Sequence, residues 1–193
     1  MDTIVGVGGC GVRVVDYIAR NTPGFNLAAI EKEKSVLDRS LASHKLFIGE
    51  EGMSDSELFY FGVYLAEKHR KKIISFLRGF QALVFVAGFG QTSSGMLPVM
   101  AAAVNDLGIP MKAIVSIPFG FEGKLCAARA ERGISVLQAE NIDMCVLSMG
   151  AETAWLSKFA TFRDAMEKMD EIMARRAVEA VGWESEAHPD NRK

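Results

Sequence analysis

The stretch IVGVGGCGVRVVDYIAR, residues 4–20, joins a short apolar run to three glycines spaced G-x-G-x-x-G and then to a helical pattern. Gly6, Gly8 and Gly11 allow the backbone to turn tightly and to approach an anion. A helix that begins near Cys10 would point its unpaired N–H groups and the positive end of its dipole at a phosphate. This stretch therefore predicts a strand, a phosphate-binding turn and a helix.

Short apolar runs alternate with longer helical patterns along the rest of the chain, which is typical of βαβ units around a parallel sheet. The runs lack polar alternation, which indicates strands buried on both faces. We expect strands at residues 2–7, 26–31, 45–48, 82–87, 112–117 and 143–148. We expect helices at residues 10–20, 54–78, 95–107, 124–139 and 161–181. Right-handed crossovers then predict an α/β fold with a doubly wound, mostly parallel six-stranded sheet and helices on both faces.

The composition narrows the class of protein. The chain has 193 residues, the length of one ordinary domain, which we expect over residues 1–182. Residues 183–193 are polar and include a proline, so we expect a flexible tail there. The formal net charge of −2 argues against a nucleic-acid partner. No apolar run reaches the roughly 20 residues of a membrane span and no signal segment opens the chain, so a cytoplasmic protein is expected. The three cysteines and three histidines are scattered, and they predict neither a disulfide framework nor a metal site.

Two further loops share the character of the first. The sequence AGFGQTSSG, residues 87–95, follows the fourth predicted strand, and PFGFEG, residues 118–123, follows the fifth. Glycines permit close backbone approach, and hydroxyl groups can donate to phosphate oxygens or to water on a magnesium ion. Either the first turn or the 87–95 loop, taken alone, is equally consistent with an ordinary strand-to-helix turn capped by serine. Together, at the carboxyl ends of adjacent strands, these two glycine-rich loops predict a site for a nucleotide with two or three phosphates.

The three loops, in this order, resemble the phosphate-binding loop, the glycine-rich signature loop and the Pro-Phe-x-Phe-Glu-Gly loop of the FtsZ/tubulin superfamily, over roughly residues 3–175. The resemblance implies a domain that binds GTP or GDP, with Mg²⁺ held through the phosphates. It implies that the nucleotide phosphates lie against Gly8, Gly9, Cys10, Gly11, Gly88, Gly90, Gln91, Thr92, Ser93, Ser94 and Gly95. It also implies that Glu122 accepts hydrogen bonds from the ribose hydroxyls.

The segment RDAMEKMDEI, residues 163–172, resembles the helix of the same superfamily that contacts the nucleobase. Asp170 then stands at the position of the carboxylate that reads guanine, since a carboxylate can accept from both N1–H and the 2-amino group. Met166 lies one turn earlier, where the superfamily has an aromatic residue against the base. An ordinary solvated charge on the helix surface is the competing interpretation of Asp170.

Several positions depart from the superfamily pattern. The GQTSSG segment is one residue shorter than the usual signature loop, Arg13 replaces an asparagine near the base, and Cys126 replaces an arginine. The chain stops before the acidic loop that completes hydrolysis in a neighbouring subunit, so the sequence assigns no catalytic residue. We therefore expect a weak or partner-dependent GTPase that acts in or regulates a cytoskeletal filament or assembly. Its expected partner is a second copy or a full-length FtsZ/tubulin-like protein.

Two alternative functions are consistent with the residues. The G-x-G-x-x-G spacing also fits an NAD(P)-binding oxidoreductase or sensor, and Glu31, about 20 residues further on, could then hold the adenine ribose. That reading leaves the loops at 87–95 and 118–123 without a shared purpose. The second alternative is a degenerate scaffold that keeps the fold and binds no nucleotide.

Overall fold

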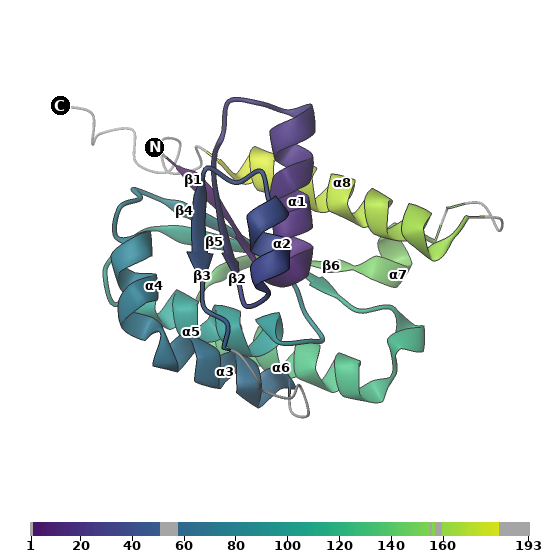
Figure 1. The fold of residues 1–193 in the computed structure, drawn as a ribbon. Coiled ribbons are helices and arrows are strands. Elements are labelled where there is room, and N and C mark those ends of the chain that lie inside the picture. The colour runs from purple at the N-terminus through teal and green to yellow at the C-terminus, as the bar shows by residue number, and fades with distance from the viewer. Residues whose placement is uncertain (1, 51–57, 155, 157–159, 182–193) are drawn as a thin grey trace.

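The computed structural model describes residues 2–50, 58–154, 156 and 160–181. Six strands form one sheet in the order β3-β2-β1-β4-β5-β6, and every neighbouring pair is parallel (Figure 1). Their bounds are β1 Thr3–Val7, β2 Asn26–Glu31, β3 His44–Phe47, β4 Leu83–Gly88, β5 Met111–Ile117 and β6 Asp143–Ser148. The predicted doubly wound sheet is confirmed, and each strand lies within one residue of its predicted bounds.

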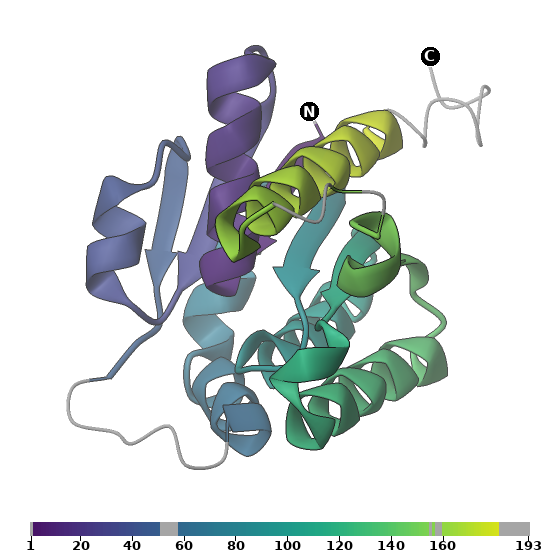
Figure 2. The same cartoon turned by 90° about the vertical axis from the view of Figure 1, so that its right-hand side faces the viewer.

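Helices cover both faces of this sheet, as the sequence predicts (Figures 1 and 2). One face carries α1 (Gly8–Asn21), α2 (Lys34–Arg39), α7 (Met149–Glu152) and α8 (Phe162–Ala180), and the other carries α3 (Leu58–Lys68), α4 (Arg70–Leu77), α5 (Ser93–Asn105) and α6 (Lys124–Ala139). Each face of the sheet has its own hydrophobic core. Alternate residues of a strand belong to the two cores, since side chains along a strand point to opposite faces. Ile4 packs with α1 and α8, whereas Val5 packs with α5.

The structure also corrects the expected helices. The long helix expected over residues 54–78 is two helices, α3 and α4, which meet at His69, where the backbone has φ −97° and ψ 11°. Residues 54–57 of that expectation, and the tail expected over 183–193, lie outside the described residues. The short helices α2 and α7 and the 3₁₀ turn η1 (Gly120–Glu122) were not predicted, because elements of three to six residues are too short to show a periodic pattern.

The strand order positions the candidate site. Chain connections leave β1 and β4 in opposite directions across the sheet, and ligands of open α/β sheets bind outside the carboxyl ends of strands at such a switch point. Residues 8–11 and 88–95 follow these two strands. Within the described part of the chain, no helix is long and apolar enough to cross a membrane.

Candidate functional site

The two glycine-bearing loops begin side by side. Val7, the last residue of β1, pairs with Ala87 of β4, so the next residues, Gly8 and Gly88, open their loops on adjacent strands. Gly8 has φ +72°, and a methyl group there would lie well inside van der Waals contact with Ser93 Oγ. The first turn therefore faces the start of α5 directly, and the two loops enclose common space.

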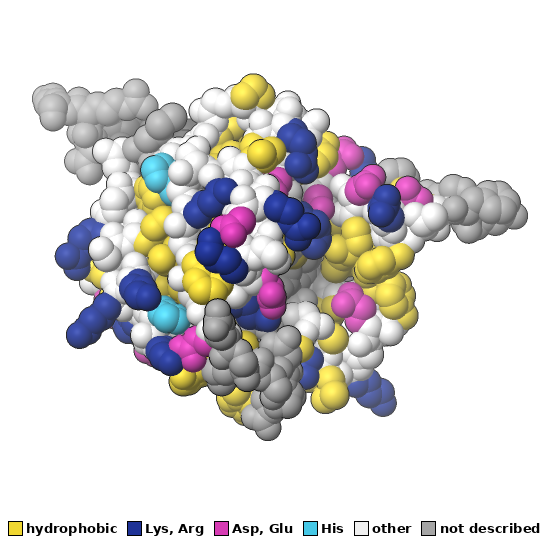
Figure 3. All heavy atoms as spheres, viewed as in Figure 1, with side chains coloured by type: hydrophobic (Ala, Val, Ile, Leu, Met, Phe, Trp, Pro, Cys, Tyr) yellow, Lys and Arg dark blue, Asp and Glu magenta, His cyan; other side chains and the backbone are white. Residues whose placement is uncertain are grey.

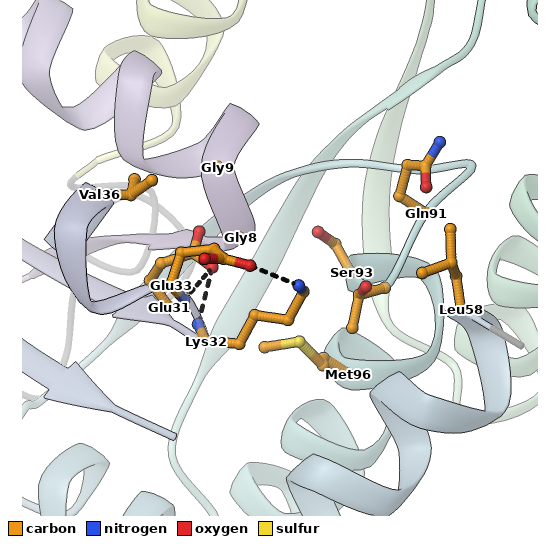
Figure 4. Close-up of a pocket in the computed structure, with 11 residues that line it drawn as sticks. Gly8, Gly9, Glu31, Lys32, Glu33, Val36, Leu58, Gln91, Ser93 and Met96 are labelled. Atoms are coloured by element: carbon orange, nitrogen blue, oxygen red, sulfur yellow. Dashed lines mark hydrogen bonds and ion pairs between the residues drawn. The ribbon is translucent and has the colours of Figure 1, made fainter. Parts of the chain in front are cut away.

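The first cavity in this space, the Glu31 cavity, has a volume of about 200 Å³ (Figure 4). It lies between the start of α1, the end of β2 and the start of α5. The residues that line it are Gly8, Gly9, Glu31, Lys32, Glu33, Val36, Leu58, Gln91, Thr92, Ser93 and Met96. Because α1 and α5 both begin here, their unpaired N–H groups make the Glu31 cavity suited to an anion.

The second cavity, the Met166 cavity, has a volume of about 270 Å³ and adjoins the first, since Gly9, Gln91 and Ser93 line both. Its other lining residues are Cys10, Arg13, Gly88, Phe89, Ser116, Glu122, Met149, Phe162 and Met166. This lining is more apolar and includes an aromatic ring and two methionines. The two cavities together form a groove with a polar end and an apolar end, which fits a ligand that joins phosphates to a flat base.

Four residues expected at the phosphates make packing contacts or hydrogen bonds within the protein and do not line the groove. Gly11 is part of α1 and faces β4, where a methyl group on it would collide with the backbone oxygen of Val86. A methyl group at Gly95 would collide with the backbone of α3 at Phe59. Ser94 is fully buried, and its Oγ accepts a hydrogen bond of 2.7 Å from the N–H of Gly90, which has φ +116°. Gly11, Ser94, Gly95 and Gly90 line neither cavity.

Thr92 and Ser93 remain as the hydroxyl groups of the second loop that line the groove. Both residues are buried, with 6% exposed, and they stand at the start of α5. The neighbouring Gln91 donates from Nε2 to Cys126 Sγ at 3.7 Å, and this contact joins the loop to α6. The loop thus presents two hydroxyl groups on a rigid support.

Glu122 is exposed, and its side chain is tied to its own loop. The backbone N–H of Phe119 donates to Glu122 Oε1 at 2.8 Å, and Glu122 lines the Met166 cavity. The second carboxylate oxygen, Oε2, can accept a hydrogen bond from a hydroxyl donor at the cavity mouth.

Asp170 forms an ion pair that the sequence did not predict. Arg13 donates to both carboxylate oxygens, from Nε to Oδ2 at 3.0 Å and from Nη2 to Oδ1 at 3.3 Å. Asp170 is 7% exposed, and burial raises the pKa of its carboxyl group while the adjacent Arg13 opposes that rise. Arg13 lines the Met166 cavity and Asp170 does not, so the guanidinium group is the nearer of the two to a ligand.

Phe162 is a lining residue that the sequence analysis missed. It lies one helical turn before Met166, which itself lies one turn before Asp170, so the three share one face of α8. Its ring packs with Phe119 and Phe121 at centroid distances of 5.8 and 6.0 Å. Figure 3 shows hydrophobic side chains gathered on the right of the molecule, near the start of α8. The spacing of four residues along α8 was the signal that could have found Phe162.

Glu31 is the most confined charged group in the groove. It is 2% exposed, and its Oε1 accepts hydrogen bonds from the backbone N–H groups of Lys32 at 2.7 Å and Glu33 at 3.0 Å. Its Oε2 is buried without a hydrogen-bond partner in the structure. Burial raises the pKa of Glu31, and the two backbone N–H donors oppose that rise.

Cys10 provides a prediction that is independent of any ligand. Burial raises the pKa of its thiol from 9.0 to about 11, against the opposing effect of Arg13. Since the thiolate is the nucleophile, we expect iodoacetamide to modify Cys10 at pH 7.5 about 100-fold more slowly in the folded chain than in denaturant, and faster as the pH rises toward 11. Mass spectrometry of the Cys10 peptide measures both rates. Equal rates in the folded and denatured chain would contradict the raised pKa of this thiol.

Known proteins are similar to this chain in sequence and in fold. The profile of the Tubulin/FtsZ family, GTPase domain, matches residues 3–149. The chain is 28% identical to the cell division protein FtsZ of Rickettsia felis over 176 residues, which cover 89% of this chain and 39% of that protein. It is 33% identical to FtsZ of Coxiella burnetii over 139 residues, which cover 69% of this chain and 36% of that protein. The chain thus spans well under half the length of these curated relatives.

Solved structures agree on the fold. A mutant FtsZ from M. jannaschii superposes with a TM-score of 0.82 at 23% identity, over 91% of this chain and 54% of that one. CetZ2 from Haloferax volcanii, in a GTPγS-bound protofilament, superposes with a TM-score of 0.78 at 21% identity, over 92% of this chain and 57% of that one. With the profile match over residues 3–149, the sheet order and the groove at β1 and β4, the chain belongs to the Tubulin/FtsZ family and carries its GTPase domain.

Proposed function

We propose that this chain binds GTP and GDP in the groove formed by the Glu31 and Met166 cavities, and that it hydrolyses GTP slowly unless a partner subunit completes the site. The observation that carries the proposal is the meeting of two glycine-bearing loops on adjacent strands, with Gly8 facing Ser93. Two turns that share one space can grip one polyphosphate, whereas two separate turns would serve two smaller anions.

The phosphates belong at the Glu31 cavity in this proposal. The start of α1 offers backbone N–H groups and the positive end of a 14-residue helix. The hydroxyl groups of Thr92 and Ser93 add donors from the opposite side. These groups are fixed by secondary structure before any ligand arrives, so little ordering entropy opposes binding.

The base and ribose belong at the Met166 cavity. Met166 and Phe162 supply apolar surface for a flat ring, and Glu122 supplies a carboxylate oxygen for ribose hydroxyls. Asp170 reads the guanine edge in this proposal, because each of its oxygens keeps a second lone pair beside the bond from Arg13. The side chain of Arg13 is 44% exposed and has room to shift when a base enters.

Mg²⁺ fits the donor set of the Glu31 cavity. Carboxylate and hydroxyl oxygens, together with phosphate oxygens of a ligand, are the hard ligands that this ion takes. When bound, the ion would neutralise phosphate charge. The residues present that could hold it are Glu31, Thr92 and Ser93.

We propose further that the domain works within a filament or assembly, through self-association or with a full-length FtsZ/tubulin-like partner. The support is the relatives themselves, which include cell division proteins and a CetZ2 protofilament with GTPγS. If a partner completes the hydrolytic site, the rate of GTP turnover per molecule rises with protein concentration or on addition of a full-length relative. A phosphate-release assay over a dilution series checks this, and a constant high rate per molecule would contradict it.

One observation favours the NAD-binding alternative and makes a direct comparison necessary. Glu31 ends β2 beside the G-x-G-x-x-G turn, where dinucleotide-binding folds hold the adenine ribose. Competition against a fluorescent GDP analogue separates the two functions. We expect GTP and GDP to displace the analogue at micromolar concentrations or below, and NADH and ATP to require at least about 100-fold more. Displacement by NADH alone would overturn the proposal.

A thermal melt addresses the scaffold alternative. GDP with Mg²⁺ at about 100 times its dissociation constant stabilises a folded domain by about 2.7 kcal/mol, which raises the melting temperature by several degrees. An unchanged melting temperature at millimolar GDP would favour a scaffold that binds no nucleotide.

A further inference from the structure

The end of α3 and the whole of α4 carry a concentration of positive charge that the nucleotide groove does not use. Residues 68–78 include five Lys and Arg and no Asp or Glu, whereas the whole chain has 22 Lys and Arg against 24 Asp and Glu. Lys and Arg side chains gather on the left of the molecule in Figure 3, where Figure 1 places α4. The five residues, here called the α4 basic patch, are Lys68, Arg70, Lys71, Lys72 and Arg78.

One side of the α4 basic patch already binds carboxylates of this chain. Lys68 pairs with Glu50, which follows β3. Arg70 pairs with Glu67 at 3.3 Å and with Asp106, at the end of α5, at 3.2 Å. These carboxylates come from three different elements, so the patch holds its cations where an approaching carboxylate can reach them.

The other side of the α4 basic patch has no acidic neighbour. Lys71, Lys72 and Arg78 are exposed and form no ion pair within the part of the chain that the structure describes. The first turn of α4 holds Arg70, Lys71 and Lys72 without an acidic residue, and cations are unfavourable at the start of a helix. Burial lowers the pKa of His69, just before α4, and the charge of Lys72 lowers it further. This uncompensated charge costs stability in the free chain, and a negatively charged partner would remove that cost.

Three observations favour a short acidic peptide segment over a membrane or a nucleic acid. The helix α4 has 8 residues and is about 12 Å long, which matches about four residues of an extended chain. None of the exposed large hydrophobic side chains belongs to α4, whereas a helix that binds a membrane inserts such side chains. A long nucleic acid would extend past the patch onto a chain whose acidic residues outnumber its basic ones.

We propose that the α4 basic patch is a docking site for an acidic segment of a partner protein, whose carboxylates bind Lys71, Lys72 and Arg78. The contact repeats between chains what Lys68 and Arg70 do within this one. The patch shares no residue with the Glu31 and Met166 cavities, so docking does not depend on the proposed binding of nucleotide.

Binding of a model peptide tests the proposal. The probe is a fluorescein-labelled peptide of about twelve residues, half of them Glu, and its control is the same peptide with Gln in place of Glu. In about 50 mM NaCl we expect fluorescence anisotropy to give a dissociation constant of about 10–100 μM for the Glu peptide, and at least about 10-fold weaker binding of the Gln peptide. In about 300 mM NaCl the Glu peptide should bind at least about 5-fold more weakly, because salt screens exposed charges.

Reversal of the three unpaired charges should remove this binding. The triple variant Lys71→Glu, Lys72→Glu and Arg78→Glu should bind the Glu peptide at least about 30-fold more weakly than the unaltered chain does. The matched control is the variant Lys124→Glu, Arg163→Glu and Arg175→Glu, because it makes the same change in net charge at exposed positions on α6 and α8. It should keep the affinity for the Glu peptide within about 3-fold.

Cross-linking of the unaltered chain keeps the test valid if the triple variant folds poorly. A carbodiimide joins a carboxylate to a lysine amine that lies against it. We expect the Glu peptide to be attached to Lys71 and Lys72 at least about 10-fold more often than to Lys124, which is exposed on α6. Mass spectrometry of the digested product measures this ratio.

The contrary outcomes are equally definite. No binding of the Glu peptide at low salt, an unchanged affinity in the triple variant, or equal cross-linking of all three lysines would overturn the docking site. Binding of phosphatidylserine vesicles or of a DNA oligonucleotide without binding of the Glu peptide would also overturn it, in favour of another anionic partner. The triple variant should bind GDP as the unaltered chain does, so failure of the peptide leaves the proposed function intact, and failure of GDP leaves the docking site intact.

Discussion

Replacing Gly8 with alanine is expected to weaken GDP binding by more than about 100-fold while the domain stays folded. Gly8 has φ +72°, a conformation that costs a residue with a side chain about 1 kcal/mol. The new methyl group would also displace Ser93 Oγ, while Ser93 Cβ, at 3.4 Å, can stay in place. Rotation of one hydroxyl group relieves the contact, so the methyl group mainly fills the space where a phosphate must approach the backbone.

Two other glycines serve as controls for this result. Gly79→Ala should change neither binding nor stability, because its nearest neighbour, the oxygen of Phe76, lies at an ordinary 3.8 Å. Gly11→Ala should lower the melting temperature more than Gly8→Ala does, since its methyl group meets the fixed backbone of Val86. GDP titration and thermal melts measure the three variants. Gly8→Ala binding within threefold of the unaltered chain would show that the first turn does not hold the phosphates.

Asp170→Asn is expected to weaken GDP binding about 30- to 150-fold, which corresponds to about 2–3 kcal/mol for lost charge-assisted hydrogen bonds. A carboxylate accepts from both N1–H and the 2-amino group of guanine, whereas an amide presents one acceptor and one donor. The variant should also lose its preference for GDP over inosine diphosphate, which lacks the 2-amino group. Competition titrations with both nucleotides measure the affinity and the preference.

The stability of Asp170→Asn should change little. Asparagine can still accept a hydrogen bond from Arg13, and the Arg13 side chain, 44% exposed, keeps its contact with water when its partner loses the charge. The neutral amide also avoids the cost of burying a carboxylate at this position, where 7% of the residue is exposed. Glu167→Gln, at an exposed position on α8, is the matched control and should bind GDP normally. An unaltered preference for GDP over inosine diphosphate in Asp170→Asn would mean that another group reads the base.

The sheet could be predicted from the sequence because its strands are buried on both faces and therefore read as continuous apolar runs. Ile4 and Val5 illustrate this, since they face opposite cores and both have no exposed surface. Right-handed crossovers then predict a doubly wound sheet, and the strand order of the structure brings residues 8–11 and 88–95 to one edge. The resemblance to the Tubulin/FtsZ family pointed to the same loops and is confirmed by the match over residues 3–149.

The sequence could not show which glycines and serines of the loops line the groove and which pack against other elements, because both residue types occur in both roles. The sequence cannot distinguish Gly8, which faces the groove, from Gly11, which allows α1 to approach β4. It cannot distinguish Ser93, which lines both cavities, from Ser94, which accepts from Gly90. The assignments of Gly8 and Gly11 depend on contacts with Ser93 and Val86, some 80 residues away, which no local pattern encodes.

The pairing of Arg13 with Asp170 could not be predicted from the sequence either. The two residues are separated by 157 positions and meet because α1 and α8 pack together on one face (Figure 2). The sequence marks Arg13 only as a departure from an asparagine, and Asp170 as a candidate contact of the base. Their ion pair places Asp170 directly beside Arg13, which lines the Met166 cavity.

A crystal structure of the chain with GDP and Mg²⁺ tests the central claim most directly. The account predicts that the diphosphate accepts hydrogen bonds from backbone N–H groups at the start of α1 and from Ser93, with the base packed against Met166 and Phe162. A diphosphate bound away from the turn at Gly8, with this groove empty, would contradict it.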